Sequence, residues 1–158
     1  MFHVLALCAG NASRSILAEA ILNRDGQGRV QAWSAGANPT GVINPQVRDL
    51  LARRGAGEGA MRSKSWNEFS SAGAPRLDLV LNLCPTVSGA RQPDWPGDPL
   101  SVHWHLDDPG AAPHGQDDLA CQQAYHRLSM QVNAFLSLPF ERLSRTTLTA
   151  RLNEIGDP

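Results

Sequence analysis

An uninterrupted apolar run near the start of the chain, residues 4–7, most constrains the fold. Four consecutive apolar residues without polar alternation are typical of a strand covered on both faces, as in a parallel sheet. The run ends at Cys8, the turn-forming pair Gly10 and Asn11 follows, and apolar residues then recur at helical spacing up to Asp25. The beginning of the chain therefore predicts a strand, a loop and a helix in that order.

The same alternation continues along the chain. Residues 30–36, 77–84 and 100–106 predict three further strands, Pro45 suits the first position of a second helix, and residues 116–137 form the longest helix candidate. Strands that alternate with helices predict right-handed crossovers, and hence a single three-layer α/β domain with a four-stranded parallel sheet flanked by helices. The long helix is expected to place one apolar face on this domain, made of Leu119, Tyr125, Leu128, Val132 and Phe135.

Residues 1–138 account for the predicted domain, and residues 139–158 form a C-terminal extension. Leu148, Leu152 and Ile155 recur at helical spacing before Gly156, which predicts a short amphipathic helix. We expect this helix to pack on the domain itself or on a dimer partner.

Composition excludes several classes of function. The chain has 158 residues, which suits one domain, and 14 basic against 15 acidic residues leave a net charge of −1, so general binding to nucleic acid or anionic membranes is not expected. No apolar run approaches the roughly 18 residues of a membrane span, and the apolar start lacks the basic region of a signal peptide. The three cysteines are an odd number, which fits a reducing compartment, and we expect the cytoplasm.

The segment from Cys8 to Ser15 is the most informative part of the sequence. A cysteine at a strand end is followed by the loop residues Ala9, Gly10, Asn11, Ala12 and Ser13, and then by Arg14 and Ser15 at the start of a helix. A helix N-terminus and a guanidinium favour the thiolate form of the cysteine. Backbone N–H groups of such a turn form a concave site for a tetrahedral anion, which Arg14 can bind with two donors. Ser15 could donate a hydrogen bond to the Cys8 sulfur.

The segment of residues 8–19 resembles the phosphate loop of low-molecular-weight protein tyrosine phosphatases and of the arsenate reductases built on that fold. The resemblance extends to residues 33–36, 62–66, 95–97 and 103–109 and to the strand end at Cys84, so it covers nearly the whole chain. It implies the same four-stranded parallel sheet, with Cys8 as the nucleophile and residues 9–15 as the oxyanion cradle.

Asp108 and Pro109 match the Asp-Pro pair that supplies the general acid in this family. Such an acid is needed because the oxygen that leaves phosphorus or arsenic must be protonated. The neighbouring Asp107 is the alternative assignment. Phosphatases of the family usually carry tyrosines directly after this pair, whereas Gly110 follows here and Tyr125 is the only tyrosine of the chain, which favours the arsenate reductase branch and a role in arsenic resistance.

The resemblance implies that a second thiol, matching Cys84, attacks Cys8 to release arsenite. Thioredoxin-linked members carry a third cysteine eight residues later, where this chain has Gln92. Three routes therefore stay open: a Cys8–Cys84 disulfide reduced by glutaredoxin or thioredoxin, direct resolution by a small thiol such as glutathione, or a shuttle through Cys121. Because Cys121 falls in the predicted long helix, we expect it to be a buried structural thiol.

Two other functions compete with an arsenate reductase. In a phosphotyrosine or phosphomonoester phosphatase, water would resolve a Cys8 adduct and Cys84 would be structural. A non-enzymatic oxyanion-binding module would keep the loop without turnover. No bound cofactor is expected, and no metal either, because His103, His105 and Asp107 alternate at metal-like spacing without an evident fourth ligand.

Overall fold

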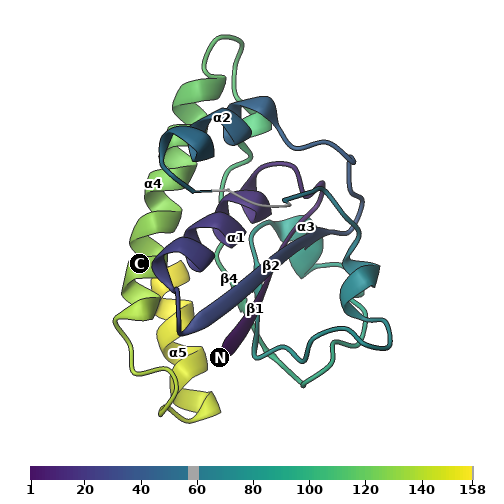
Figure 1. The fold of residues 1–158 in the computed structure, drawn as a ribbon, viewed down its shortest axis with the longest axis vertical. Coiled ribbons are helices and arrows are strands. Elements are labelled where there is room, and N and C mark those ends of the chain that lie inside the picture. Colours follow the sequence, from purple (N-terminus) through teal and green to yellow (C-terminus); the bar gives the residue numbers. More distant parts are fainter. Residues whose placement is uncertain (57–60, 158) are drawn as a thin grey trace.

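The computed structural model describes residues 1–56 and 61–157 (Figure 1). Strands and helices alternate along these residues as the apolar pattern predicts. In chain order the elements are β1 (Phe2–Cys8), α1 (Arg14–Asp25), β2 (Val30–Gly36), α2 (Pro45–Arg53), η1 (Trp66–Phe69), β3 (Leu79–Asn82), α3 (Pro85–Ser88), β4 (Leu100–His103), η2 (Pro109–Ala111), α4 (Asp117–Leu136) and α5 (Arg145–Gly156), where η marks a 3₁₀ helix.

The four strands form one parallel sheet in the order β2-β1-β3-β4. β1 is central and pairs with β2 along its whole length, from Phe2 opposite Val30 to Cys8 opposite Gly36. The predicted α/β domain with a four-stranded parallel sheet and flanking helices is confirmed. The sheet order makes β1 and β3 neighbours, so the segments that follow their carboxyl ends lie side by side.

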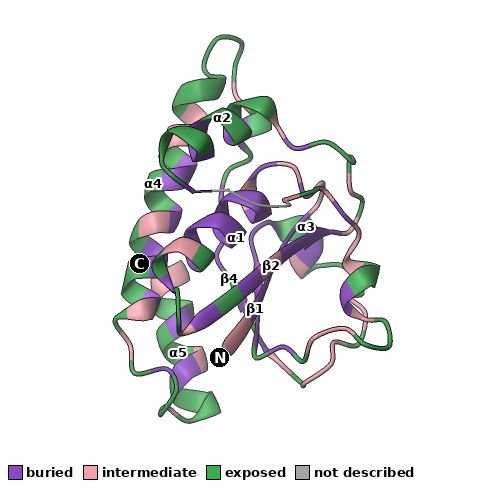
Figure 2. Cartoon of the chain, in the orientation of Figure 1, coloured by how far each residue is buried: buried purple, intermediate pink, exposed green. Residues whose placement is uncertain are grey.

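Two apolar clusters cover the two faces of the sheet. The larger cluster joins the sheet to α1, α2, α4 and α5, and the smaller one lies under η1 and α3 on the opposite face. Buried residues accordingly line the strands and the inner sides of the helices in Figure 2. Both faces of β1 are covered, which explains why residues 4–7 are apolar without alternation and are completely inaccessible to solvent.

Helix α1 is buried on nearly all sides, because it packs on β1 and β2 and is covered in turn by α2 and α4. Its residues from Ser15 to Leu22 are all buried. Two of them, Ser15 and Glu19, are polar, so each requires a hydrogen-bonding partner inside the protein. The partner of Ser15 is Cys8 and the partner of Glu19 is Ser34, and both lie toward the carboxyl end of the sheet.

The structure corrects three expectations about element boundaries. The strand predicted over 77–84 pairs only over Leu79–Asn82, since Cys84 caps α3 and Pro85 starts that helix. The strand predicted over 100–106 ends at His103, although the Trp104 N–H still bonds to the carbonyl of Asn82 in β3 and the Leu106 N–H to that of Leu83. Leu119 is 54% exposed, because it lies in the first turn of α4, before the buried face begins at Cys121.

The C-terminal helix α5 packs against β4 and α4. Leu148 and Leu152 are part of the larger apolar cluster, and the Trp104 indole donates a hydrogen bond to the Leu152 carbonyl at 2.9 Å. Among the described residues, no helix is both long enough and apolar enough to cross a membrane.

Candidate active site

The loop between β1 and α1 is held by the segment that follows β2. The carbonyls of Cys8, Ala9, Gly10 and Ala12 accept hydrogen bonds from the backbone N–H groups of residues 37, 38, 40 and 44 at 2.9–3.3 Å. Because the N–H that follows a carbonyl points the opposite way across a trans peptide, this pattern turns the N–H groups that follow these carbonyls away from that segment. Backbone N–H groups at a helix N-terminus suit an anion.

Two backbone features make the tight loop possible. Asn11 adopts a positive φ of 47°, one of the few conformations that asparagine tolerates better than other non-glycine residues. A Cβ at Gly36 would lie 2.7 Å from the Ala9 carbonyl oxygen and 2.9 Å from the Asn11 nitrogen. Only glycine at the end of β2 allows the loop to approach this closely.

A cavity of about 200 Å³ opens above the loop. Cys8 lies in its lining and is itself only 2% exposed. The Arg14 side chain is 12% exposed, and its guanidinium donates a hydrogen bond to the Leu106 carbonyl at 3.3 Å, which ties it to the segment after β4. The remaining lining residues are Gly10, Ala12, Ser13, Thr40, Asn44, Asp108 and Gly110.

The Ser15 hydroxyl lies 2.8 Å from the Cys8 sulfur. Ser15 Oγ also accepts a hydrogen bond from the Asn11 amide nitrogen at 2.7 Å. The Asn11 amide can have only this orientation, because its oxygen accepts from the Lys64 backbone N–H at 2.8 Å. Either Cys8 or Ser15 can donate in their contact, but a Cys8 thiolate has no proton, so Ser15 would then donate to the sulfur and stabilise its charge.

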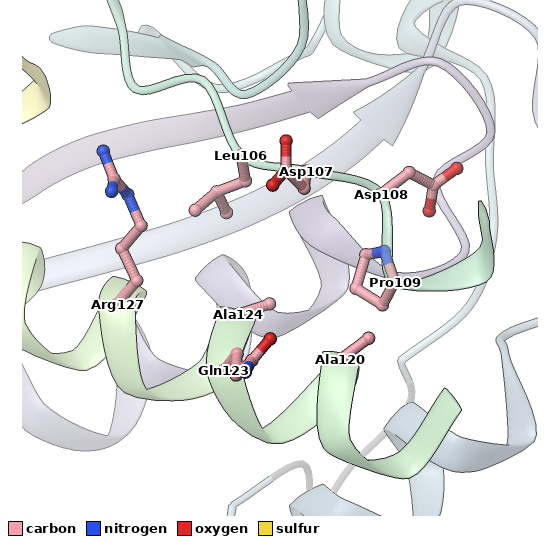
Figure 3. A pocket seen from close by; sticks show the side chains of 8 residues that line it. All are labelled: Leu106, Asp107, Asp108, Pro109, Ala120, Gln123, Ala124 and Arg127. Atoms are coloured by element: carbon pink, nitrogen blue, oxygen red, sulfur yellow. The ribbon is translucent and has the colours of Figure 1, made fainter. Parts of the chain in front are cut away.

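The structure separates the two acidic candidates. Asp108 lines the Cys8 cavity, and its Oδ2 lies 3.8 Å from Arg14 Nη2. Its other oxygen accepts from the Gly110 N–H at 2.9 Å, which fixes the carboxyl group at the start of η2. Asp107 is not in the lining of the Cys8 cavity; it lines a second cavity, between residues 106–109 and α4, which Asp108 lines as well. Figure 3 shows the two carboxyl groups pointing in different directions.

Cys84 lies two residues beyond β3, the strand next to β1. It is 2% exposed and belongs to the same apolar cluster as Cys8. It is the N-cap residue of the single-turn helix α3, and the Ser88 hydroxyl at the end of that helix donates to the Cys84 carbonyl at 3.3 Å. Both thiols therefore lie at the carboxyl edge of adjacent strands.

Gln92 occupies a structural position in the segment between α3 and β4. Its amide nitrogen donates to Asn82 Oδ1 and to the Val87 carbonyl at 2.9 Å, and its oxygen accepts from the Trp95 indole at 3.1 Å. These bonds satisfy both ends of the amide. Gln92 thus connects the end of β3 to the loop that leads into β4.

Cys121 is fully buried in α4, away from the loop. Burial raises the pKa of its thiol to about 11, and the nearby carboxylates of Asp118, Asp117 and Asp108 act in the same direction. Such a thiol stays protonated near neutral pH.

His103 and His105 converge on the Ser88 hydroxyl, with Nδ1 and Nε2 at 2.8 and 2.9 Å from its oxygen. Within the part of the chain that the structure describes, no three His, Cys, Asp or Glu side chains are grouped as metal ligands.

Several residues of the site lie outside the motif that the sequence reveals. Thr40 and Asn44 form one wall of the cavity, and the Asn44 amide donates to Ser13 Oγ at 3.1 Å. Ser63 donates to the Gly10 carbonyl at 3.2 Å, and Lys64 bonds to Asn11. Asn44 before Pro45 is recognisable in sequence as a helix cap, but its contact with the loop depends on the tertiary fold.

The parallel sheet, with a Cys-to-Arg loop between β1 and α1, defines a class of α/β proteins, and the comparisons with known proteins agree. Residues 3–147 match the family model described as low molecular weight phosphotyrosine protein phosphatase, so the chain belongs to that family. A sequence search of curated proteins finds no match.

Solved structures of both enzyme classes share the fold. The chain is similar to an arsenate reductase from Archaeoglobus fulgidus, with 25% identity, a TM-score of 0.64, and coverage of 82% of this chain and 98% of the other. A low molecular weight protein tyrosine phosphatase from T. tengcongensis is 23% identical with a TM-score of 0.60, and the match covers 81% of this chain and 95% of the other. A thioredoxin-dependent arsenate reductase from Corynebacterium glutamicum is 24% identical with a TM-score of 0.60, and the match covers 81% of this chain and 58% of the other. The family model and the similar solved structures together support an enzymatic function for this chain.

Proposed function

We propose that this protein is a thiol-dependent arsenate reductase in which Cys8 is the nucleophile, Arg14 and the N–H groups of residues 9–15 hold the oxyanion, and Asp108 is the general acid. The observation that carries the proposal is a second buried thiol, Cys84, in the apolar cluster that contains Cys8. A hydrolase resolves its covalent intermediate with water and needs no second thiol, whereas a reductase must supply two electrons.

The first step forms a bond from Cys8 Sγ to arsenic and breaks one arsenic–oxygen bond. The departing oxygen leaves as water after it takes a proton from Asp108, which lines the same cavity as Cys8. Arg14 and the loop N–H groups stabilise the negative charge on the remaining oxygens. Ser15, 2.8 Å from the sulfur, holds Cys8 as a thiolate before the attack.

The second step assigns Cys84 as the resolving thiol. Its thiolate attacks Cys8 Sγ, the sulfur–arsenic bond breaks, and the electron pair of that bond stays on arsenic, which leaves as arsenite. A Cys8–Cys84 disulfide remains, and an external dithiol protein such as thioredoxin or glutaredoxin returns two electrons and two protons. Alternatively, glutathione resolves the Cys8 adduct directly. Either reductant is available in a reducing compartment such as the cytoplasm.

The rim of the cavity supports a small substrate. Gly110 follows Asp108 and Pro109, and the cavity lining contains no aromatic side chain among the described residues. An aryl phosphate would find no ring on which to stack there, whereas a free oxyanion needs none.

A phosphatase is the second candidate, and the surroundings of Gln92 favour it. The residue at the position of the third cysteine is held by three hydrogen bonds to the core of the α3–β4 segment. This part of the chain therefore has a packing role. A relay that needs a third cysteine at the position of Gln92 cannot operate. Water would then resolve a Cys8 thiophosphate.

A thiol count tests the proposal. Fully reduced wild type and Cys84→Ser are mixed with arsenate in the absence of reductant, and free thiols are counted before and after. We expect wild type to lose two thiols and Cys84→Ser to form no internal disulfide. The matched control is Cys121→Ser, which should still lose two thiols.

Two other outcomes would contradict the reductase or its relay. If wild type loses no thiol but reduces arsenate when glutathione is added, the Cys84 relay is wrong and an external thiol resolves the adduct. If arsenite never forms and p-nitrophenyl phosphate is hydrolysed in a Cys8-dependent reaction, the protein is a phosphatase. Cys8→Ser should abolish turnover in each case, and turnover that persists would remove Cys8 from the mechanism.

A further inference from the structure

A buried ion pair lies beneath the anion-binding loop, outside the residues that the proposed chemistry uses. Lys64 is the only lysine of the chain, and its side chain is 7% exposed. Its Nζ lies 3.8 Å from Oε1 of Glu19, whose side chain is 10% exposed. Lysine and glutamate are seldom buried without a specific reason, because each charge is costly to remove from water.

Each member of this pair is held by further hydrogen bonds. Glu19 Oε1 accepts from the Ser34 hydroxyl at 3.1 Å, and Lys64 Nζ donates to the Arg62 carbonyl at 3.0 Å. The pair thus joins α1, β2 and the segment 62–65 at one point. Arg62 itself turns outward and pairs with Glu68.

Burial opposes the charge on both partners. It raises the pKa of Glu19 and lowers the pKa of Lys64, and in each case the attraction of the partner acts against this effect. Each charge therefore depends on the other. If the ammonium were removed, Glu19 would be left buried without a compensating cation.

The backbone of Lys64 connects this pair to the loop. Its carbonyl accepts from the Gly36 N–H at 2.9 Å, so the segment adds to the edge of β2. Its N–H donates to Asn11 Oδ1 and thereby sets the orientation of the Asn11 amide. That amide donates to Ser15 Oγ, which lies 2.8 Å from Cys8 Sγ. Four residues thus form one continuous path from the buried ammonium to the sulfur.

We propose that Lys64 is a positioning residue, whose ammonium, paired with Glu19, fixes the Lys64 backbone N–H against Asn11 and so holds the loop and Ser15 in the arrangement that keeps Cys8 reactive. The inference rests on the proposed role of Cys8 as the nucleophile. It assigns to Lys64 no contact with substrate: the ammonium acts through the backbone of its own segment.

The test measures Cys8 directly, so that it does not depend on which oxyanion is the substrate. Cys8 is alkylated with iodoacetamide over a range of pH, and the modified peptide is quantified by mass spectrometry, with and without inorganic phosphate as the anion probe. The variants are Lys64→Met, which keeps the aliphatic stem and removes the charge, and Lys64→Met with Glu19→Gln, which removes both charges.

We expect Lys64→Met to move the pH midpoint of Cys8 alkylation upward by about one unit, which is a tenfold loss of thiolate at lower pH. Protection by phosphate should weaken roughly tenfold, the size expected when one donor to a charged group is misplaced. The double variant should keep most of both effects, because it has no unpaired carboxylate but still lacks the ammonium that fixes the Lys64 segment.

A stability control separates positioning from general damage. Leu148→Ala removes a buried side chain from α5, distant from the loop, and should destabilise the fold without moving the Cys8 midpoint. An unchanged midpoint in Lys64→Met, an equal shift in Leu148→Ala, or a double variant that recovers the wild-type midpoint would each overturn the inference. Failure of the underlying function looks different: wild-type Cys8 would then show neither enhanced alkylation below pH 8 nor protection by phosphate.

Discussion

The Ser15 hydroxyl lies 2.8 Å from the Cys8 sulfur and accepts a hydrogen bond from the Asn11 amide. A Cys8 thiolate has no proton, so Ser15 must be the donor between them when the sulfur is charged. A neutral donor at a buried sulfur stabilises the thiolate without adding a charge to the site.

Ser15→Ala should therefore lower the turnover of arsenate roughly 10- to 100-fold, the range expected for a hydrogen bond to a charged group. The pH midpoint of Cys8 alkylation should rise in parallel. Ser129→Ala is the matched control, because the Ser129 hydroxyl in α4 is buried without a hydrogen-bond partner in the described structure. Steady-state kinetics and peptide alkylation of both variants check the prediction, and equal activity of the two would contradict it.

Asp108→Asn should reduce turnover on the order of 10²- to 10⁴-fold, because the departing oxygen would lose its proton donor. Binding of phosphate should change little or improve, since the substitution removes a negative charge near Arg14. Asp107→Asn serves as the control, because Asp107 lines the other cavity. The comparison uses turnover together with phosphate inhibition, and a greater loss of turnover in Asp107→Asn would reverse the assignment.

Cys121 should stay unmodified by iodoacetamide in the folded protein at pH 8, because burial raises the pKa of its thiol to about 11. The reactive thiolate accumulates only as the pH approaches that value. Alkylation in urea at pH 8 should proceed readily, which confirms that the native environment is responsible. Rapid native modification of Cys121, measured on its peptide, would instead support the shuttle through this residue.

Glu141→Gln should weaken the pH dependence of stability in acid. Two hydrogen bonds from the Arg29 guanidinium hold the Glu141 carboxylate and lower its pKa to about 2. A carboxyl group with a lowered folded-state pKa contributes stability that is fully present above its unfolded value of 4.5 and is lost as the pH falls toward 2.

Urea unfolding at pH 6 and pH 3 checks this prediction. The loss of stability between the two pH values should be smaller in Glu141→Gln than in wild type. The difference should shrink in 1 M salt, because both side chains are exposed enough for screening. An identical loss in the two proteins would show that the pair adds nothing to folding.

Much of the fold could be predicted because its signals are local. The apolar run at residues 4–7, the helical spacing after Asn11 and the alternation of both patterns specify a parallel α/β sheet. Element ends were less predictable: Cys84 was expected to end a strand but caps α3 instead, because Pro85 cannot continue the ladder. Leu119 is apolar yet exposed, since helical spacing alone does not tell where packing on a helix begins.

Cys8, the turn residues and Arg14 lie close together in the sequence, so their order alone indicates the family to which the chain belongs. The neighbours of this loop become visible only in the folded protein. Asp108 rather than Asp107 lines the cavity that contains Cys8, and Lys64, 53 residues beyond Asn11, orients the Asn11 amide. These contacts join segments far apart in the chain, so their distances and burial arise only when the sheet brings the segments to one edge.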